Sequence, residues 1–503
     1  MTAARVLVFA ALAAFLALVV ASAWVCDDAY ITFRTVDNFL HGYGLRWNVA
    51  ERVQVFTHPL WMGVLVALGA FTGHLYASAI AASLAFSMAA VGLLALGIAR
   101  TPGSALLGLA PLLLSSAFVD YSTSGLENPL SHFLLAVFLW LWLVRSSDHP
   151  SLAALSACAA LLALSRIDLL LLVGPALLLA FLRHPSRRAA GSIVLGLVPL
   201  LAWEIFSIVY YGFPLPNTAY AKLGTGVESA LLWQQGGFYL LDSLRTDPLA
   251  LVATSIAIGG AFARGNRREQ ALAGGSLLYL LYVVSIGGDF MSGRFLAAPL
   301  FVGCGLLARW QAPGRSLLVG AWLASVGLAA LGSAPPWSRG AGFGVDRELA
   351  IPVRGIANER AFYYPHTGLL RVWLGQGRPE EHPFAVQGRE VQEAGTGGAA
   401  GQALGLHGYH AGPGIHILDV VALTDPLLAR LPARAGKWRI GHFERAIPTG
   451  YARTVHEGEN HIEDPDLADY YEAIRNVTRG PLFARDRWRD IVRLNLEAAP
   501  ASR

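Results

Sequence analysis

The chain has 503 residues, of which 54% are hydrophobic and only 14% are charged, and its mean hydropathy is +0.48. A soluble protein of this length carries about a quarter charged residues, so the composition excludes an ordinary soluble protein. The formal net charge of +4 gives no indication of a nucleic-acid partner, and the three cysteines form no disulfide framework.

Apolar runs recur along about the first 330 positions, which is typical of a polytopic α-helical membrane protein. The runs lie near 5–25, 59–73, 76–99, 103–119, 128–144, 151–164, 168–182, 190–210, 249–263, 270–286, 295–308 and 316–332. After about Ser333 the chain becomes rich in Arg, Glu, Asp, His, Gly and Pro. We therefore predict a transmembrane domain over 1–333 and a soluble α/β domain over 334–503.

The arginines predict the orientation of these runs, because short cytoplasmic loops carry an excess of basic residues. The loops that bear arginine contain Arg100, Arg145, "RHPSRR" at 183–188, "RGNRR" at 264–268 and "RWQAPGR" at 309–315. The loops between these arginine-bearing loops then lie on the outer face. They carry nearly all the polar residues of the types that serve in catalysis and ligand binding. Run 59–73 is short and follows His58, so we interpret it as a partial or re-entrant segment. About eleven crossings then place the C-terminal domain outside the cytoplasm.

The first outer segment is "CDDAYITFR" at 26–34, directly after the first apolar run. Adjacent residues do not share a face, so Asp27 and Asp28 are not a simple acid pair. One carboxylate can act as general base for an acceptor hydroxyl, which is worth about 10²–10⁴ in rate, while the other holds a cation or fixes the loop. Alternatively, either one caps the following helix.

The segment that follows repeats apolar residues at helical spacing, namely Tyr30, Phe33, Val36 and Leu40. This pattern is that of a helix lying on the membrane interface. A second outer segment, "PLPNTAYAK" at 214–222, has a stiff turn before a short helix that starts at Asn217 or Thr218. Its Lys222 either meets a phosphate as a point charge or extends to the interface as lysines commonly do.

Three further outer segments carry charge. "GGDFMSGRF" places Asp289 and Arg294 in one glycine-bounded loop, where the arginine can clamp phosphate oxygens or simply pair with the acid. "SGLENPL" places Glu127 at a helix start, and an acid there has a purely structural explanation as well. Arg166 and Asp168, in "LSRIDLL", are close enough to pair with each other across a short turn.

Together, the segments "DDAYITFRTVDNFLHGYGLRWNVAERV", "TSGLENPL", "LSRIDLLLL", "YYGFPLPNTAYAK" and "GGDFMSGRFLAAPL" resemble bacterial GT-C membrane glycosyltransferases. The greatest similarity is to arabinofuranosyltransferases of cell-wall assembly and pilin modification, which use a polyprenyl-phosphate sugar. The C-terminal segments "YHAGPGIHILDVVALTDPLLARLP", "WRIGHFERAIPTGY" and "YYEAIRNVTRGPLF" resemble the extracytoplasmic domain of that group. The resemblance implies a protein of the bacterial cytoplasmic membrane that acts on a cell-envelope glycan or protein.

The resemblance also implies roles for residues. An acid in the first outer loop serves GT-C enzymes as catalytic base or metal-linked acid, and Asp27 and Asp28 fill that position, with Asp28 favoured as the base. The residues that match donor phosphate or sugar contacts are Arg34, Glu127, Asn217, Lys222, Asp289 and Arg294. Some GT-C enzymes need a divalent cation, but no multi-carboxylate cage is visible in the sequence.

Other interpretations stay open. Within the same class, the sugar could be mannose or another pentose. A lipid-linked sugar flippase or transporter would carry ionisable residues near helix midpoints and internal repeats, and a scaffold would use its C-terminal domain only to bind glycan. In that domain Trp438, Phe443, Tyr451 and Tyr470 either stack on sugars or fill the core, which is the commoner role.

Overall fold

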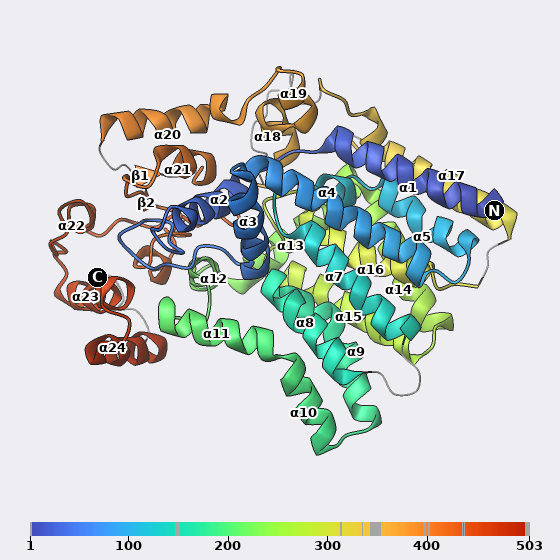
Figure 1. The fold of residues 1–503 in the computed structure, drawn as a ribbon, viewed down its shortest axis with the longest axis horizontal. Coiled ribbons are helices and arrows are strands. Elements are labelled where there is room, and N and C mark those ends of the chain that lie inside the picture. Colours follow the sequence, from blue (N-terminus) through green and yellow to red (C-terminus); the bar gives the residue numbers. More distant parts are fainter. Residues whose placement is uncertain are drawn as a thin grey trace. The chain divides into compact units, whose positions relative to one another are not determined.

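The computed structural model describes residues 3–145, 151–311, 314–333, 335–342, 354–395, 399–400, 403–434, 436 and 438–497. These residues are mostly helical (Figure 1). They form two compact units. Unit 1 comprises Met1–Cys26, Tyr76–Leu200 and Ser229–Gly377, and unit 2 comprises Asp27–Leu75, Leu201–Glu228 and Arg378–Arg503.

This division differs from the predicted domain boundary at 333/334. Residues 354–377 follow the last apolar helix but belong to unit 1, because they bond to the end of the first helix. Arg360 Nε donates to the Ser22 carbonyl at 2.9 Å, and Leu369 N donates to the Ala23 carbonyl at 2.9 Å. Conversely, two segments of the predicted membrane domain, 27–75 and 201–228, pack with the C-terminal residues in unit 2.

Unit 1 is a bundle of helices. Its helices are α1 (Ala3–Ser22), α4 (Leu75–Leu93), α5 (Pro102–Leu114), α6 (Ser116–Asp120), α7 (Asn128–Trp140), α8 (Leu152–Ser165), α9 (Leu170–Arg183), α10 (Arg187–Gly196), α13 (Ser229–Thr246), α14 (Pro248–Arg264), α15 (Arg267–Ser285), α16 (Ala297–Leu307), α17 (Arg315–Leu331), α18 (Glu359–Thr367) and α19 (Leu369–Trp373). Short π-helical turns extend α4 to Ile98 and α7 to Arg145. All the predicted apolar runs are helical where the structure describes them.

By length and composition, three described helices can cross a membrane: Ala3–Ser22, Leu75–Ile98 and Asn128–Arg145. Two bent pairs raise this number to five if each pair is one span, namely α10 with α11 (Val198–Tyr210), bent by 56°, and α13 with α14, bent by 108°. The chain is thus helical with several membrane-length apolar helices, as predicted. The total of about eleven crossings stays a prediction, since the other apolar helices are shorter.

The sequence did not predict α13. Its polar stretch Gln234–Gly237 interrupts the apolar pattern, so no hydrophobic run is visible there. The buried face of this helix nevertheless includes Tyr239 and Ser243. One face of α13 therefore packs on neighbouring helices, while apolar side chains such as Trp233 and Leu241 are exposed on the rest of it.

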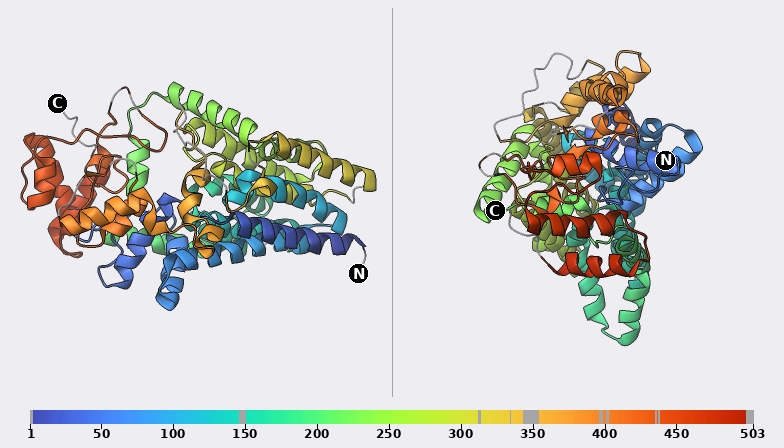
Figure 2. Two further views of the ribbon diagram at one scale, coloured as in Figure 1. Left: turned by 90° about the horizontal axis from the view of Figure 1, so that it is seen from above. Right: turned by 90° about the vertical axis from the view of Figure 1, so that its left-hand side faces the viewer.

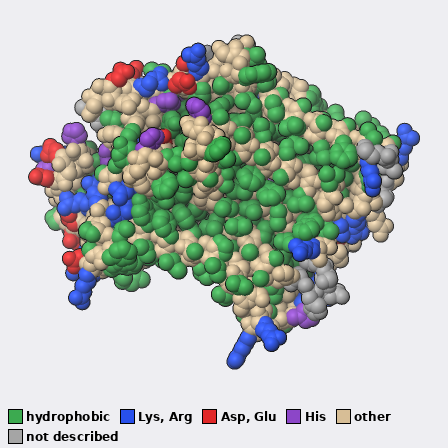
Figure 3. All heavy atoms as spheres, in the orientation of Figure 1, with side chains coloured by type: hydrophobic (Ala, Val, Ile, Leu, Met, Phe, Trp, Pro, Cys, Tyr) green, Lys and Arg blue, Asp and Glu red, His purple; other side chains and the backbone are tan. Residues whose placement is uncertain are grey.

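Close helix packing and an apolar exterior characterise unit 1. A Cβ at Gly275 would overlap the Leu172 carbonyl, so only glycine allows α15 to approach α9 this closely. Large apolar side chains such as Leu178 and Leu182 are exposed on α9. Hydrophobic side chains gather over much of the face of the molecule in Figure 3. Extensive exposed apolar surface is the property expected of helices in contact with lipid.

Unit 2 combines short helices with long loops. Its elements are α2 (Asp27–Leu40), α3 (Pro59–Thr72), most of α11, α12 (Asn217–Leu223), α20 (Pro383–Ala394), β1 (Ala399–Ala400), α21 (Gly405–Ala411), β2 (Leu418–Asp419), α22 (Tyr451–Glu457), α23 (Pro465–Arg479) and α24 (Arg485–Leu496). Strands β1 and β2 pair in parallel over two residues each. They form the only sheet among the described residues, so the α/β character predicted for 334–503 is limited to this pair.

The core of unit 2 lies around α23, which packs against α24 (Figure 2). Phe443, Tyr451 and Tyr470 are all buried, and the ring of Trp438 lies 5.7 Å from that of Phe443. Core packing is therefore the role of these aromatic residues that the structure favours over sugar stacking.

The apolar face of α2 also differs from expectation. Tyr30, Phe33 and Val36 are buried inside unit 2, and the Tyr30 ring lies 5.6 Å from that of Tyr409 in α21. The helical spacing was predicted correctly, but this face packs on protein rather than on the membrane interface.

Candidate active site

The two acids of the first outer segment have different environments at the start of α2. Asp27 is buried, and its carboxylate accepts the N–H of Gly405 at 2.9 Å and of Leu406 at 2.8 Å. A Cβ at Gly405 would overlap the Asp27 carbonyl, so the contact requires glycine there. Burial raises the pKa of Asp27 to about 6, although these hydrogen bonds oppose the rise. Asp27 thus fixes the N-terminus of α21 to α2.

Asp28 is only partly buried. The sequence predicted that one acid would face a reacting hydroxyl while the other fixed the loop. Asp27 fixes α21 to α2, and the role of Asp28 as the catalytic base stays a prediction.

Arg34 lies about two helical turns further along α2. It is 2% exposed, and its guanidinium donates to the carbonyls of Trp47 at 2.9 Å, Ile415 at 2.7 Å and Gly408. It also stacks over the Trp47 ring, 4.5 Å from the centroid. Since these contacts use all three guanidinium nitrogens, the structure favours a structural role over the predicted contact with donor phosphate or sugar.

Replacing Arg34 by lysine or methionine is therefore expected to lower the unfolding temperature. Each buried carbonyl that loses its donor costs about 1–3 kcal/mol, and a lysine cannot bond to three carbonyls at once. Thermal unfolding of the purified variants in detergent measures the effect. A lysine variant as stable as wild type, but with weakened donor binding, would restore the phosphate role.

Asn217 begins α12, as the sequence predicted, and its side chain is also largely occupied. Its amide nitrogen donates to the carbonyls of Ala422, Leu423 and Asp425, each at 3.1 Å. It therefore holds the loop at 422–425 beside α12. Lys222, near the end of the same helix, is exposed, which leaves its ammonium accessible to an anion.

Three predicted residues of unit 1 form one charged cluster. Arg294 Nη2 lies 3.2 Å from Glu127 Oε1, and Arg294 Nη1 lies 3.6 Å from Asp289 Oδ2. Their side chains are 12%, 1% and 6% exposed, respectively. The outer segments "SGLENPL" and "GGDFMSGRF" therefore meet, and Arg294 is the most accessible member of the group.

Arg166 extends this cluster. Its Nη2 lies 2.5 Å from Asp168 Oδ2, which confirms the predicted pair, and it donates to the Tyr279 hydroxyl at 3.2 Å. Its Nε is also 3.8 Å from Glu127 Oε1. Glu127 thus lies between two arginines and orients Arg294, a link that sequence spacing could not reveal.

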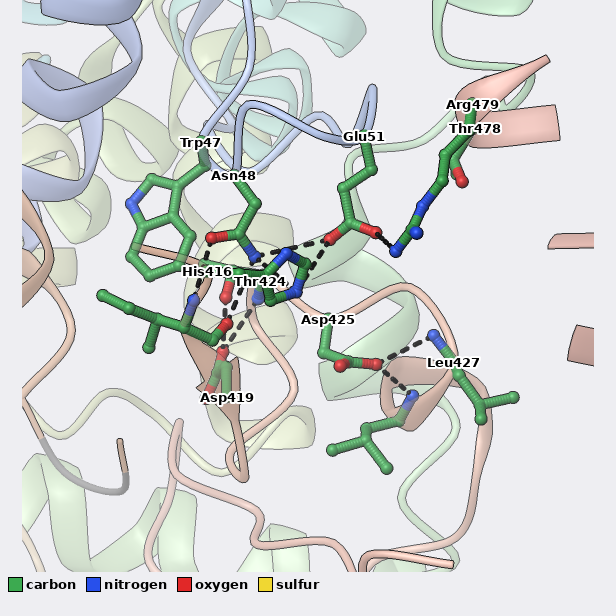
Figure 4. A network of polar contacts seen from close by, with 12 residues as sticks. Trp47, Asn48, Glu51, His416, Asp419, Thr424, Asp425, Leu427, Thr478 and Arg479 are labelled. Atoms are coloured by element: carbon green, nitrogen blue, oxygen red, sulfur yellow. Dashed lines mark hydrogen bonds and ion pairs between the residues drawn. The ribbon is translucent and has the colours of Figure 1, made fainter. Parts of the chain in front are cut away.

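A second polar network, in unit 2, was not predicted. Glu51 lies 3.4 Å from Arg479 Nη2 and 3.8 Å from His416 Nε2, while Asn48 bonds both ways with the backbone of Ile417 (Figure 4). These contacts join the loop after α2 to residues far away in the sequence. Asp425, nearby in Figure 4, accepts the N–H of Leu428 at 2.8 Å.

The stability of the chain is expected to depend on pH through Asp425. Burial, aided by the Glu51 charge, raises its pKa to about 7 from the unfolded value of 3.8. The folded state therefore binds the proton of the Asp425 carboxyl more tightly than the unfolded state does. The contribution of Asp425 to the free energy of unfolding is thus greatest at low pH. It decreases by a few kcal/mol as pH rises from about 4 to 7, since each pKa unit is worth about 1.4 kcal/mol.

Thermal unfolding between pH 4 and pH 8 checks this expectation. The wild-type unfolding temperature should decrease with pH across this window, and Asp425→Asn should flatten the decrease. An equal slope in both proteins would contradict it.

A divalent cation has no evident place in this arrangement. Among the described residues, no group of three or more His, Cys, Asp or Glu side chains is arranged to hold a metal ion. The acids of the unit 1 cluster face arginines instead. The described residues therefore show no carboxylate cage for the divalent cation that some GT-C enzymes need.

The candidate residues divide between the two units. Asp27, Asp28, Arg34, Asn217 and Lys222 belong to unit 2, and Glu127, Asp289 and Arg294 belong to unit 1. Within unit 1 the three residues meet directly, and within unit 2 Asp27 and Arg34 both hold α21.

Comparison with known proteins bears on the chemistry. No family model matches the chain. A terminal β-(1→2)-arabinofuranosyltransferase of Mycobacterium tuberculosis is 27% identical over 523 residues, covering 84% of this chain and 81% of that protein. The chain is thus similar to an arabinofuranosyltransferase along most of its length. The predicted resemblance is thus confirmed, and with it the class of enzyme, a glycosyltransferase.

A second arabinofuranosyltransferase of the same name, from Corynebacterium glutamicum, is 30% identical over 325 residues, covering 55% of this chain and 46% of that protein. Among solved structures, this chain is similar to ArnT from Cupriavidus metallidurans bound to undecaprenyl phosphate. That match has a TM-score of 0.48 and 16% identity, and covers 82% of this chain and 85% of the other.

Proposed function

We propose that this glycosyltransferase transfers arabinofuranose from a polyprenyl-phosphate donor to a hydroxyl of a cell-envelope glycan or protein. The observation that carries the proposal is the similarity to a terminal β-(1→2)-arabinofuranosyltransferase along more than four fifths of both chains. We also propose that the reaction takes place at the outer face of the bacterial cytoplasmic membrane, where nucleotide sugars are absent and the donor has to arrive on a lipid.

In the proposed reaction, the Asp28 carboxylate takes the proton from the acceptor hydroxyl. The hydroxyl oxygen then bonds to the anomeric carbon of the sugar, and the bond from that carbon to the phosphate oxygen breaks. The polyprenyl phosphate leaves with the electron pair of that bond. This leaving group gains negative charge, so a cation held in place beforehand lowers the barrier.

Arg294 is the cation best suited to this task. Glu127 and Asp289 hold its guanidinium from two sides, which reduces the cost of orienting it during the reaction. The exposed Lys222 supplies a second positive charge for the lipid phosphate. Asn217 and Arg34 contribute to the stability of unit 2.

A transfer assay with the purified full chain in nanodiscs tests the proposal. Polyprenyl-phosphate arabinofuranose and polyprenyl-phosphate mannose are each offered with cell-envelope glycan acceptors, and glycosidic product is measured by mass spectrometry. Product from the arabinofuranosyl donor supports the proposal, and product from the mannosyl donor alone would replace the sugar. Movement of intact lipid across proteoliposomes without any product would favour a flippase instead.

A further inference from the structure

Helix α13, which the sequence did not predict, contacts the loop that carries Arg294. Tyr239, Asp242 and Thr246 are spaced at i, i+3 and i+7, so they lie on one face of this helix. The Tyr239 ring packs on Gly288, where a Cβ would overlap the ring, so the loop lies directly against α13. Tyr239 is 0% exposed, and its hydrogen bonds therefore form away from water.

The hydroxyl of Tyr239 lies across the turn formed by residues 291–294, here named the Arg294 turn. It donates to the Met291 carbonyl at 3.2 Å and accepts the N–H of Phe295 at 3.1 Å. The Met291 carbonyl also accepts the N–H of Arg294 at 3.4 Å, which closes the turn. A single side-chain oxygen thus bonds to the backbone on both sides of Arg294.

Two further contacts fix the same turn. The Ser292 hydroxyl donates to Asp242 Oδ2 at 2.6 Å, so a second residue of α13 holds it. The backbone of Ala357 also pairs with the loop. Its N–H donates to the Phe290 carbonyl at 2.8 Å, and its carbonyl accepts the N–H of Ser292 at 3.0 Å. The Arg294 turn is therefore held by α13 and by the segment that precedes α18.

Arg294 is thus fixed at its backbone as well as at its guanidinium, which pairs with Glu127 and Asp289. Asp289 belongs to the same loop and moves with it, so this ion pair alone does not fix the loop. A reacting group has to be held within about 0.5 Å of its productive position by contacts that lock its supports. The bonds from α13 supply that restraint for Arg294.

We propose that Tyr239 is a positioning residue for sugar transfer, which acts by fixing the Arg294 turn. This inference rests on the proposed function, in which Arg294 stabilises the leaving phosphate. In the proposed reaction Tyr239 contacts neither the donor nor the acceptor. It acts through Arg294, whose guanidinium loses its fixed position when the Tyr239 hydroxyl is removed.

Sugar transfer by Tyr239→Phe in nanodiscs tests the inference. The variant keeps the buried ring but loses the hydroxyl, so kcat should decrease about 10-fold, within the loss of up to about 10²-fold that a misplacement of about 1 Å can cause. The KM for acceptor should stay unchanged. Tyr364→Phe is the matched control and should leave kcat unchanged. Tyr364 is also 0% exposed, but its hydroxyl donates to the Ala21 carbonyl, at 3.0 Å, and not to the Arg294 turn.

A double-mutant cycle gives a readout that a purely structural role of Tyr239 would not change. In the Arg294→Met background, Tyr239→Phe should lower kcat no further, because the cation that Tyr239 positions is gone. An equal loss of kcat in both backgrounds would overturn the inference, as would a normal kcat in the single variant Tyr239→Phe.

Ser292→Ala repeats the cycle with a smaller change to the same turn. It removes the hydroxyl that donates to Asp242, so kcat should decrease about 3-fold in the wild-type background and not at all beside Arg294→Met. If Tyr239→Phe unfolds, this second cycle decides. A normal kcat in Ser292→Ala, or an equal loss in both backgrounds, would then overturn the inference.

The same assays separate this inference from the proposed function. Additive losses, with Arg294→Met itself impaired, would refute the role of Tyr239 and leave the transferase intact. Absence of transfer from any lipid donor by the wild-type chain would refute the proposed function itself.

Discussion

Replacing Asp28 by asparagine is expected to lower the rate of sugar transfer by about 10²–10⁴-fold, the usual contribution of a general base. Asparagine has the same size but cannot take a proton from the acceptor. Because Asp28 is only partly buried, the substitution should leave the unfolding temperature nearly unchanged. The measurement is kcat with saturating donor and acceptor, together with a thermal unfolding curve of the same preparation.

Asp27→Asn is the matched control, one residue away. The Asp27 carboxylate accepts two backbone N–H groups, one on each oxygen. An asparagine amide has only one acceptor oxygen, so its NH₂ group would face one of these N–H donors. We expect a loss of stability of about 1–3 kcal/mol and normal kcat for the folded fraction. The opposite result, an inactive but stable Asp27→Asn and an active Asp28→Asn, would exchange the two roles.

Arg294→Met is expected to reduce kcat by about 10²–10³-fold, since it removes a preorganised positive charge from the leaving phosphate. The fold should survive because Glu127 retains Arg166 as a partner, 3.8 Å away. Arg294→Lys should recover part of the activity, because it restores a positive charge without the two-sided geometry.

Two comparison variants make this result specific. Arg100→Met removes another arginine of unit 1, which lies 3.4 Å from Glu269, and should leave kcat unchanged. Glu127→Gln should instead destabilise the protein by about 3–5 kcal/mol, since it removes the anion that pairs with the buried Arg166 and the partly buried Arg294. Full activity in Arg294→Met would exclude the proposed phosphate contact.

The helices of unit 1 were predictable because their apolar runs are long enough to be recognised in the sequence. The exceptions are α13, which carries no such run and packs on neighbouring helices through one face, and α18 and α19, which follow the last apolar run. The loops that meet at Arg294 were predictable as a group, because alternating topology puts them on one face. Their pairing through Glu127 was not, because only the folded chain brings residues 127, 166 and 294 within ion-pair distance.

The composition of unit 2 could not be predicted. The side chain of Arg52 donates to the carbonyl of Tyr210 and to that of Val477. This one residue therefore joins three segments that are far apart in the sequence, those around 52, 210 and 477. Arg34 and Asn217 resemble ligand-binding residues by type, yet their donors are engaged with backbone carbonyls. Residue type and loop position indicate that a side chain is suited to catalysis or ligand binding. Whether other protein groups already occupy that side chain depends on the tertiary structure.

The most direct test of the account is an experimental structure of the full chain with a phosphonate analogue of the polyprenyl-phosphate donor. We predict a phosphonate oxygen about 3 Å from the Arg294 guanidinium, with Asp28 facing the anomeric carbon across a gap that admits a hydroxyl. A phosphonate bound away from Arg294, with Asp28 in a separate region, would contradict the proposed reaction.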